Sequence, residues 1–232
     1  MYAKYVKRPL DFLLSLAGLI VLSPVLLVMA AVGAVVMRGN PFFAQVRPGK
    51  DEKLFRLVKF RSMTNRRDAN GEFLPDEQRL TAYGKFIRDT SLDELPELWN
   101  ILKGEMSIVG PRPQLVRDMV FMTDNQRRRH SVRQGLTGLA QCSGRNAISW
   151  EHKMEYDLQY IGNITFMGDV RIIFKTVKSV FVREGIRKDD MATSEDLGDY
   201  LLRTGQVSPE DYERKQQQAA VLIAWMQGTE RQ

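Results

Sequence analysis

Residues 12–37 read FLLSLAGLIVLSPVLLVMAAVGAVVM, a run without a single charged side chain near the N-terminus. A helix rises about 1.5 Å per residue, so roughly 20 residues are enough to cross the hydrocarbon core of a bilayer. The run is also longer than the apolar region of a signal peptide, which has about 7–15 residues. The stretch therefore predicts membrane attachment, and its simplest form is one spanning helix.

Two features favour a helix that enters the bilayer and returns to the same face. Pro24 lies mid-run, lacks an N–H and clashes with the Ile20 carbonyl, which predicts a break. Ser23 can hydrogen-bond to the carbonyl that is freed. Both flanks are basic, whereas a spanning helix needs only one cationic end; these residues are Lys4, Lys7, Arg8, Arg38, Arg47 and Lys50. We expect a re-entrant helix–break–helix segment over residues 1–38.

Asp11 is a carboxylate at the edge of the apolar run, where an unpaired charge is costly. Lys7 and Arg8 precede it by four and three residues, on the same face of a helix. We therefore expect Lys7, Arg8 and Asp11 to form a local ion-pair cluster at the membrane interface.

The whole chain has 232 residues, a net charge of +6 and a single cysteine, Cys142. This length suggests one globular domain besides the membrane segment, and we assign residues 39–188 to it and 189–232 to a C-terminal extension. One cysteine excludes an intramolecular disulfide and a zinc site built from cysteines. The basic balance indicates acidic partners, such as phosphorylated substrates, anionic lipid or nucleic acid.

The remainder predicts an α+β fold that is mainly helical. Residues 42–60 are rich in β-formers around a Pro-Gly turn and predict a small β-hairpin. Helices are predicted at residues 81–88, 91–104, 114–126, 149–161, 170–182 and from 208 onward, while 106–113 and 134–138 have the composition of loops. The segment 170–182 is amphipathic and cationic, as in helices that lie on a membrane surface. We expect such interfacial helices around a compact globular core.

Asp93 and Glu94 are the sharpest chemical signal. Ser91 and Glu94 have the spacing of a capping box, and Gly104 is a natural helix end. Acidic residues in a first helical turn commonly complement the helix dipole. The same position attracts a phosphate and lowers a carboxylate pKa, so that one carboxylate could act as a nucleophile and the other could bind Mg²⁺ or move a proton.

Arg112 is the second signal, because it stands between Pro111 and Pro113. Prolines on both sides hold the backbone extended, and a rigid guanidinium suits bidentate recognition of phosphate. Lys59 and Arg88 add positive charge. The run Arg127 to Arg129 is typical of a solvated helix end.

Together these residues resemble the monotopic phosphoglycosyl transferases, also called the bacterial sugar transferase family. The resemblance runs from about Lys7 to Lys188. It rests on Lys7-Arg8-x-x-Asp11, Ser23-Pro24, Gln45-x-Arg47-Pro48-Gly49, Lys59-Phe60-Arg61-Ser62-Met63, Arg88-x-x-Ser91-Leu92-Asp93-Glu94-Leu95-Pro96, Met106-Ser107-x-Val109-Gly110-Pro111-Arg112-Pro113 and Gly144-Arg145-Asn146. No single motif is specific, but the set in this order is. The short chain is similar to the minimal members that transfer a diacetylbacillosamine phosphate in glycoprotein glycan assembly.

The resemblance implies transfer of a sugar-1-phosphate from a UDP-sugar to polyprenol phosphate, usually undecaprenol phosphate, with Mg²⁺ and release of UMP. It implies that Asp93 is the nucleophile of a ping-pong reaction and that Glu94 assists in proton transfer or metal binding. The other active-site residues implied are Arg112 with Pro111 and Pro113 at the nucleotide end, and Lys59, Arg88 and Asp157. Lys7, Arg8 and Asp11 would lock the membrane segment near the lipid phosphate. The implied location is the bacterial inner membrane, with the catalytic domain on the cytoplasmic face.

Two other classes of function were weighed. A membrane-tethered nucleic-acid-binding module would explain the basic charge, but the sequence lacks a zinc motif, a recognition helix and alternating aromatic and basic residues, so no nucleic-acid partner is expected. A scaffold protein would use the C-terminal helix as a docking surface, and a homo-oligomer formed through the extension is compatible with catalysis.

Overall fold

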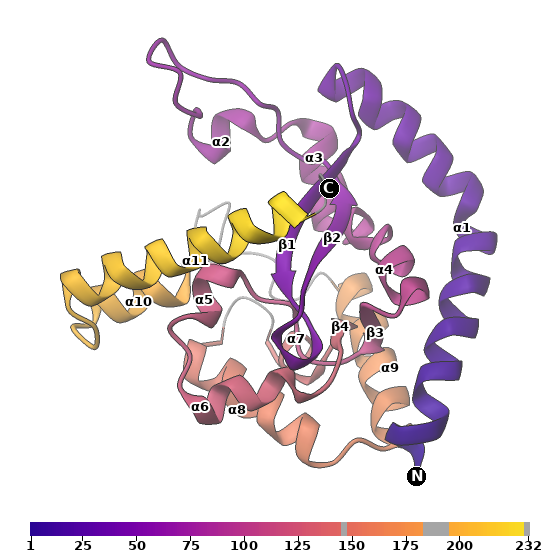
Figure 1. The fold of residues 1–232 in the computed structure, drawn as a ribbon. Coiled ribbons are helices and arrows are strands. Elements are labelled where there is room, and N and C mark those ends of the chain that lie inside the picture. Colours follow the sequence, from indigo (N-terminus) through magenta and orange to yellow (C-terminus); the bar gives the residue numbers. More distant parts are fainter. Residues whose placement is uncertain (145–147, 183–194, 230–232) are drawn as a thin grey trace.

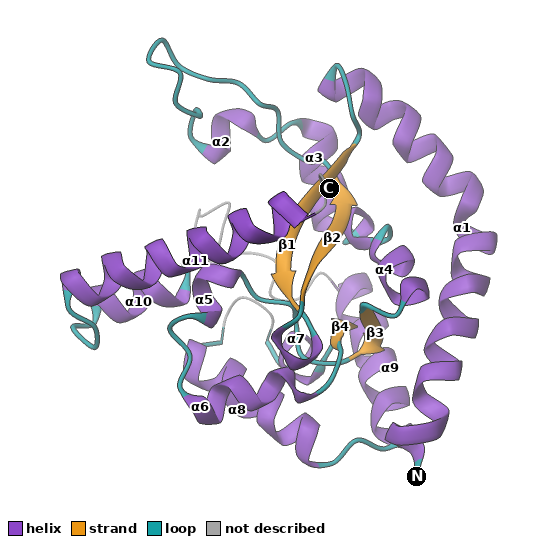
Figure 2. Cartoon of the chain, in the orientation of Figure 1, coloured by secondary structure: helices purple, strands orange, loops and turns teal. Residues whose placement is uncertain are grey.

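The computed structural model describes residues 1–144, 148–182 and 195–229 (Figure 1). Helices dominate, and the strands are few and short, as Figure 2 shows, so the α+β, mainly helical class is confirmed. The helices are α1 Lys7–Met37, α2 Asp76–Arg79, α3 Ala82–Asp89, α4 Glu97–Lys103, α5 Val116–Met119, α6 Asp124–Arg127, α7 Leu139–Cys142, α8 Trp150–Gly162, α9 Phe166–Val182, α10 Leu197–Arg203 and α11 Pro209–Thr229. The strands are β1 Phe42–Pro48, β2 Leu54–Phe60, β3 Met106–Val109 and β4 Gln134–Thr137.

The N-terminal helix α1 runs without interruption along one side of the molecule (Figure 1). Pro24 lies inside it, so the expected helix–break–helix is not what the structure contains. The hydroxyl of Ser23 donates to the Ile20 carbonyl at 2.7 Å. This is the carbonyl that a proline at position 24 leaves without its N–H, and the hydroxyl thereby helps the helix to continue past the proline.

Most large side chains of α1 point away from the protein. Exposed ones are Phe12, Leu13, Leu14, Leu16, Ile20, Val21, Val25, Leu27, Val28, Val32, Val35 and Val36. Among the described residues one helix, Tyr2–Met37, is long and apolar enough to cross a membrane, and only 11% of its most apolar window is buried. An uncovered apolar surface of this size is typical of a membrane contact.

Asp11 connects α1 to the globular part. Its carboxylate accepts hydrogen bonds from the Ser107 hydroxyl at 2.7 Å and from the Ile108 N–H at 3.1 Å, both on β3. Lys7 Nζ lies 4.0 Å from Asp11 but 2.6 Å from Asp169. The predicted ion pair of Lys7 with Asp11 is therefore present, but the cluster is not local, because Lys7, Arg8 and Asp11 all make shorter contacts with tertiary partners.

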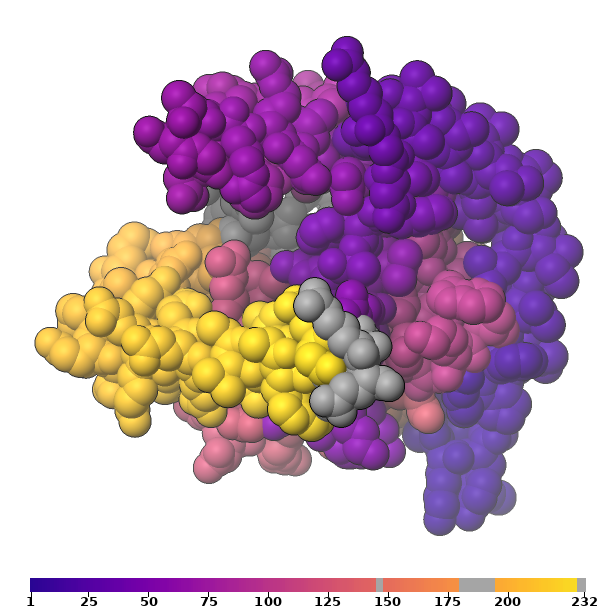
Figure 3. Space-filling view, turned by 45° about the horizontal axis from the view of Figure 1, so that its top comes forward, coloured from indigo at the N-terminus to yellow at the C-terminus, as the bar shows by residue number. Residues whose placement is uncertain are grey.

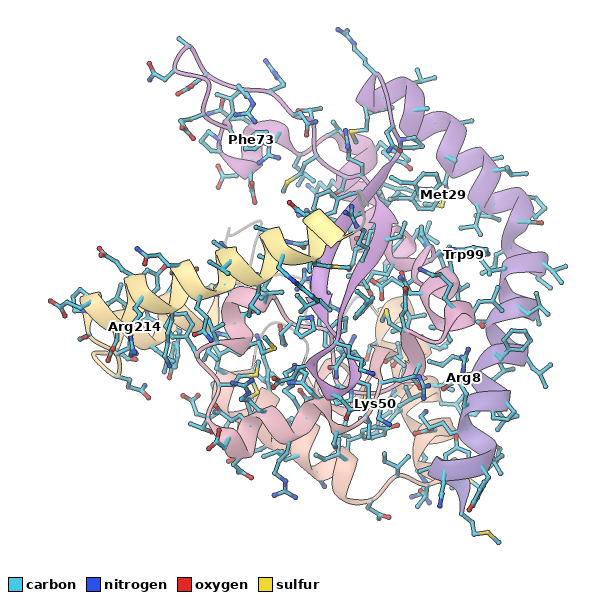
Figure 4. The ribbon with its side chains drawn as sticks, viewed as in Figure 1. Arg8, Met29, Lys50, Phe73, Trp99 and Arg214 are labelled. Atoms are coloured by element: carbon cyan, nitrogen blue, oxygen red, sulfur yellow. The ribbon has the colours of Figure 1, made fainter. Side chains whose placement is uncertain are left out.

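Arg8 makes a second connection, pointing from α1 toward the globular part in Figure 4. Its guanidinium donates to the carbonyls of Ile101 and Leu102 at 2.7 and 2.9 Å. These carbonyls belong to the last turn of α4, where a helix has unsatisfied acceptors and partial negative charge. Arg8 therefore serves as a cap for α4.

The chain from Phe42 to Phe60 forms an antiparallel strand pair, with Phe42 opposite Phe60 and Pro48 opposite Leu54. Arg47 and Pro48 lie in β1 rather than in the turn, because the chain reverses after Gly49 through a single 3₁₀ turn at Lys50–Glu52. The hairpin places Lys59, near the end of β2, next to α4.

Strands β3 and β4 pair in parallel, although both were predicted to be loops. Each has only four residues, too few to show an alternating pattern. The glycines that suggested turns permit a close backbone approach instead. A Cβ on Gly135 would lie 2.1 Å from the Gly110 nitrogen, so only glycine fits at that position.

The predicted helix at 114–126 is instead two short helices, α5 and α6. Thr123 starts the second with its own capping box, in which its hydroxyl accepts from the Gln126 N–H at 3.3 Å. The helices predicted from residues 81 and 149 form as α3 and α8, with Thr81 and Ser149 as side-chain caps.

The C-terminal helices α10 and α11 pack on α5. They share one hydrophobic cluster, which includes Val116, Met119, Val120, Phe121, Met122, Trp150, Leu197 and Ala219. In Figure 3, α11 lies on the opposite side of the molecule from α1. The described part of the extension is thus joined to the globular core by buried apolar contacts.

Candidate active site

Asp93 and Glu94 lie on a 3₁₀ turn, Leu92–Glu94, between α3 and α4. The predicted capping box is wrong, because Ser91 has a left-handed backbone (φ 56°) and its side chain makes no cap. Helix α4 begins only at Glu97, after Pro96, and ends as predicted at Gly104 with φ 88°. The two carboxylates are therefore displayed by a turn that precedes the helix.

Glu94 is held between two cations that come from different elements. Lys59 Nζ on β2 lies 2.7 Å from Glu94 Oε1, and Arg112 Nη2 on the loop after β3 lies 2.9 Å from the same oxygen. Lys59 also lies 3.1 Å from the buried Glu97 carboxylate. The structure thus joins Lys59, Glu94 and Arg112, as sequence reasoning expected, and adds Glu97, which it missed.

The charged groups of this cluster shift one another's pKa values. Burial opposes ionisation of Glu94, but Arg112 and Lys59 hold its pKa well below the usual range. Burial raises the pKa of Glu97 to about 7, against the opposing effect of Lys59. Glu94 is consequently ionised at every physiological pH, while Glu97 is poised to hold or release a proton.

Asp93 has the opposite behaviour to its neighbour. Burial, followed by repulsion from Glu94, raises the Asp93 pKa to about 6. The expectation of a lowered pKa was therefore wrong, because burial and Glu94 outweigh the opposing effects of Lys59, Arg88 and Arg112. Within the described residues its carboxylate has no hydrogen bond or ion pair, so it is poorly solvated but uncommitted, as a nucleophile needs to be.

A cleft of about 1180 Å³ contains these groups. Of the predicted site residues it is lined by Lys59, Arg88, Asp93, Glu94, Arg112 and Asp157. The Arg88 Nε donates to the Ser62 hydroxyl at 2.8 Å, and its charge lowers the pKa of Asp93. The cleft therefore brings together two carboxylates and three cations at one end.

Asp157 contacts the loop that carries Arg112 through Arg129. Its carboxylate accepts from Arg129 Nε and Nη2 at 2.9 and 2.7 Å, and Arg129 Nη2 also donates to the Arg112 carbonyl at 2.6 Å. Arg129 is fully buried, so the interpretation of the 127–129 run as a solvated helix end was wrong. Arg127 pairs with Glu52, so two of the three arginines have carboxylate partners.

Pro111 and Pro113 do not line the cleft but fix the loop that carries Arg112. The Pro111 carbonyl accepts from the Gly135 N–H at 2.8 Å, and the Pro113 carbonyl accepts from Arg47 Nη1 at 3.2 Å. Arg47 itself lines the cleft. The sequence placed it in the motif Gln45-x-Arg47-Pro48-Gly49, where it counted only as a basic residue flanking the apolar run and not as a residue of the site.

The donor groups of the site decide whether Mg²⁺ fits there. Nowhere in the described ranges do three His, Cys, Asp or Glu side chains cluster as a metal cage. Asp93 and Glu94 nevertheless fit Mg²⁺, which commonly binds one or two carboxylates together with substrate phosphates and water. Burial and then repulsion from Glu94 raise the pKa of Asp93, and a bound cation would offset both effects.

A cation-lined cleft with an uncommitted carboxylate, beside a helix with a bare apolar surface, defines a membrane-associated enzyme for an anionic substrate. Residues 2–183 match the model of the bacterial sugar transferase family, and the chain belongs to that family.

Its relatives differ in length. The chain is 48% identical to an uncharacterized sugar transferase, EpsL, of Bacillus subtilis, over 79% of this chain and 89% of that protein. It is 37% identical to the undecaprenyl-phosphate galactose phosphotransferase of Salmonella typhimurium over 79% of this chain and 42% of the relative. It is 40% identical to the UDP-glucose:undecaprenyl-phosphate glucose-1-phosphate transferase of Klebsiella pneumoniae, over 77% of this chain and 40% of the relative. The chain thus spans less than half of the two relatives whose names state a reaction.

Proposed function

We propose that this protein transfers a sugar-1-phosphate from a UDP-sugar to polyprenol phosphate and releases UMP. Membership of the family supports this, as do the names of the Salmonella and Klebsiella relatives, which specify undecaprenyl phosphate as the acceptor. The product would be the membrane-bound starting unit of a glycan, such as an exopolysaccharide or a glycoprotein glycan. The relatives' names specify galactose and glucose, so the bacillosamine donor stays a prediction from the sequence.

The observation that carries the proposal is the different state of two adjacent carboxylates. Glu94 is clamped by Lys59 and Arg112, whereas Asp93 has no partner in the described structure and a pKa of about 6. At pH 7 Asp93 is largely ionised without being strongly solvated. This combination favours nucleophilic attack by Asp93, and the low pKa of Glu94 makes it a poor proton donor.

The reaction follows in two balanced steps. An oxygen of Asp93 attacks the phosphorus that bears the sugar, and the bond between that phosphorus and the bridging oxygen of UDP breaks. UMP leaves with the bridging oxygen and its electron pair, and the sugar phosphate is now joined to Asp93 as an acyl phosphate. An oxygen of polyprenol phosphate then attacks the same phosphorus, and the Asp93 carboxylate is the leaving group.

The cations stabilise the charge that develops on the phosphates. Arg112 and Lys59, oriented by Glu94, are placed to neutralise the leaving UMP, and Arg88 adds charge near Asp93. Asp93 and Glu94 would hold Mg²⁺, which supplies further neutralisation of the diphosphate. Asp157 keeps Arg112 in place through Arg129.

The acceptor lipid requires an apolar surface next to the cleft. A groove of about 290 Å³ lies between α1, the hairpin and α4, lined only by Leu19, Leu26, Phe42, Val58, Phe60, Pro96 and Trp99. Phe60 lines both this groove and the catalytic cleft. Figure 4 shows Met29 and Trp99 near the junction of α1 and the globular part. The groove suits the polyprenyl chain, which would enter from the bilayer.

We further propose that α1 lies in one leaflet with both of its ends on the cytoplasmic face of the bacterial inner membrane, as a helix that is bent at Pro24 but not broken there. Basic residues at both ends support this orientation, because cationic flanks favour the cytoplasmic side. The bonds of Lys7, Arg8 and Asp11 to the globular part keep the N-terminal end of α1 on the side where Asp93 lies.

A panel of UDP-sugars tests the function, with undecaprenol phosphate as acceptor and UMP release as the measurement. The panel includes galactose, glucose, N-acetylglucosamine and diacetylbacillosamine donors. We expect one or a few donors to give UMP and a radiolabelled lipid-linked sugar. Quenching the first step without acceptor should trap the sugar phosphate on the parent and not on Asp93→Asn. An Asp93→Asn variant with parental turnover would rule the mechanism out.

A further inference from the structure

The C-terminal extension contributes side chains to the catalytic cleft. The family match ends at residue 183, whereas Glu195 and Asp196 lie beyond it, directly before α10. Both line the same cleft as Asp93 and Arg112. One wall of the site is thus built by residues outside the part of the chain that defines the family.

This wall is held firmly by polar contacts. The Leu197 N–H donates to a buried Asp118 oxygen at 2.9 Å, and the Trp150 indole N–H donates to the Glu195 carbonyl at 3.2 Å. Arg117 forms an ion pair with the Asp196 carboxylate.

Packing fixes the same segment from the other side. A Cβ on Gly198 would lie 2.6 Å from the Phe121 ring, so α10 rests directly on that residue. Ala219 on α11 is 2% exposed within the same cluster. Groups at residues 195–197 therefore have defined positions in the cleft, as substrate recognition requires.

Asp196 and Arg47 offer complementary hydrogen-bonding groups in the part of the cleft beside this wall. Arg47 uses its Nη atoms on Pro113 and Gln45, and its buried Nε has no partner among the described residues. Burial and then the nearby Arg112 lower the Arg47 pKa to about 10, while Asp118, Glu97 and Asp196 oppose this. An unsatisfied buried donor beside a carboxylate acceptor fits a ligand that has both acceptors and donors.

The charge of this wall decides which part of the substrate can lie against it. Asp196 is paired with Arg117 and Glu195 with Arg203, so this wall carries little net charge, whereas Lys59, Arg88 and Arg112 give the part of the cleft around Asp93 the positive charge that attracts a phosphate. The group that this wall faces is consequently uncharged, and hydroxyl or acylamino substituents of a sugar ring have the required donors and acceptors. We propose that Asp196 and Arg47 form the subsite for the donor sugar, so that the C-terminal extension sets donor preference.

This inference rests on the proposed transferase function and is tested with steady-state kinetics of the full-length protein. The variant is Asp196→Asn, which keeps the shape of the side chain. Its control is Asp199→Asn, since Asp199 lies on α10 with its carboxylate on the Tyr212 hydroxyl and does not line the cleft. KM is measured for each active UDP-sugar, and the inhibition constant is measured for UDP, which has no sugar.

We expect Asp196→Asn to raise KM for the preferred donor by about tenfold, as loss of a charged hydrogen bond does. The ratio of KM values between the other donors and the preferred donor should therefore become smaller. The inhibition constant for UDP should change less than about twofold, and Asp199→Asn should behave as the parent does. Equal weakening of UDP and UDP-sugar would place Asp196 at the nucleotide and overturn the inference. So would unchanged donor preference in a folded Asp196→Asn protein.

Failure of the underlying function gives a different result, because the parent would then release no UMP from any donor. Circular dichroism and the thermal midpoint establish folding of the variants. If Asp196→Asn is unfolded, Arg47→Lys provides the second test, since it retains the charge but lacks the Nε–H; parental donor preference in that variant also overturns the inference.

Discussion

Arg129 and Asp157 form a fully buried ion pair at 2.7 Å, and the same guanidinium nitrogen donates to the carbonyl of Arg112 at 2.6 Å. Asp157, which was expected at the nucleotide end of the site, therefore supports the loop that carries Arg112. The pair explains how Arg112 stays in position although its own side chain is 44% exposed.

Replacing Asp157 with asparagine should destabilise the protein and lower its activity together. Removal of one partner leaves the Arg129 charge buried without compensation, which costs about 3–5 kcal/mol. Chemical denaturation should show the loss of stability, and UMP release should fall because Arg112 loses its support. Arg203→Ala, which breaks an exposed pair with Glu195, is a control and should leave the stability close to that of the parent. A variant Asp157→Asn of parental stability would contradict the role of this pair.

The rate should depend on ionisation of Asp93. Since its pKa is raised to about 6, kcat/KM should rise with pH up to about 6 and then level off, falling about tenfold per unit in more acidic solution. Glu94→Gln removes the neighbouring negative charge and frees Lys59 and Arg112, so both effects lower the Asp93 pKa. The acid limb of the much slower variant should therefore move to lower pH. A shift to higher pH would contradict this assignment.

Glu97 should make stability depend on pH. Its folded pKa of about 7 lies above the ordinary value of 4.5, so stability is greatest below the ordinary pKa and is lost as pH rises through about 7. Glu97→Gln cannot ionise and lacks this loss. The stability of the variant relative to the parent should increase by about 2 kcal/mol between pH 5 and pH 8, measured by denaturant unfolding. A difference that is constant with pH would show that Glu97 is ionised throughout.

Topology of α1 should depend on Pro24. Single cysteines at Tyr2 and Asn40, in a Cys142→Ser background, should be labelled from the same side of the membrane if α1 returns to the face that it entered. Pro24→Ala restores the N–H that pairs with the Ile20 carbonyl and favours a straight helix, so labelling from opposite sides should increase. Labelling of the parent from opposite sides would establish a spanning helix instead.

Asp11 should secure α1 to β3 without being needed for membrane binding. Asp11→Ala leaves the Ser107 hydroxyl and the Ile108 N–H without their acceptor, at a cost of about 1–3 kcal/mol for each buried group. The variant should stay in the membrane fraction but melt at a lower temperature in detergent. Lys4→Gln is the control, because Lys4 is exposed and its ammonium lies over the ring of the neighbouring Tyr5. Parental melting of Asp11→Ala would show that these bonds contribute little.

Sequence alone determined the features that depend on local or long uniform patterns. The apolar run of residues 12–37, the hairpin residues and the helices that begin near residues 81 and 149 follow from hydrophobic periodicity and side-chain chemistry within a few residues. The family motifs identified Asp93, Glu94 and Arg112 as one site, because their order along the chain is specific even though their distances are not visible.

Only the tertiary structure decided how those residues behave. Ser91 failed as a cap, and Asp93 acquired a raised rather than a lowered pKa, because burial and Glu94 outweigh any helix dipole. Pairing of β3 with β4, the burial of Arg129 and the place of Asp196 in the cleft all join residues that are far apart in sequence. Electrostatic interactions and hydrogen bonds act between groups that lie a few ångströms apart in space. The separation of two residues along the chain does not show whether they lie that close.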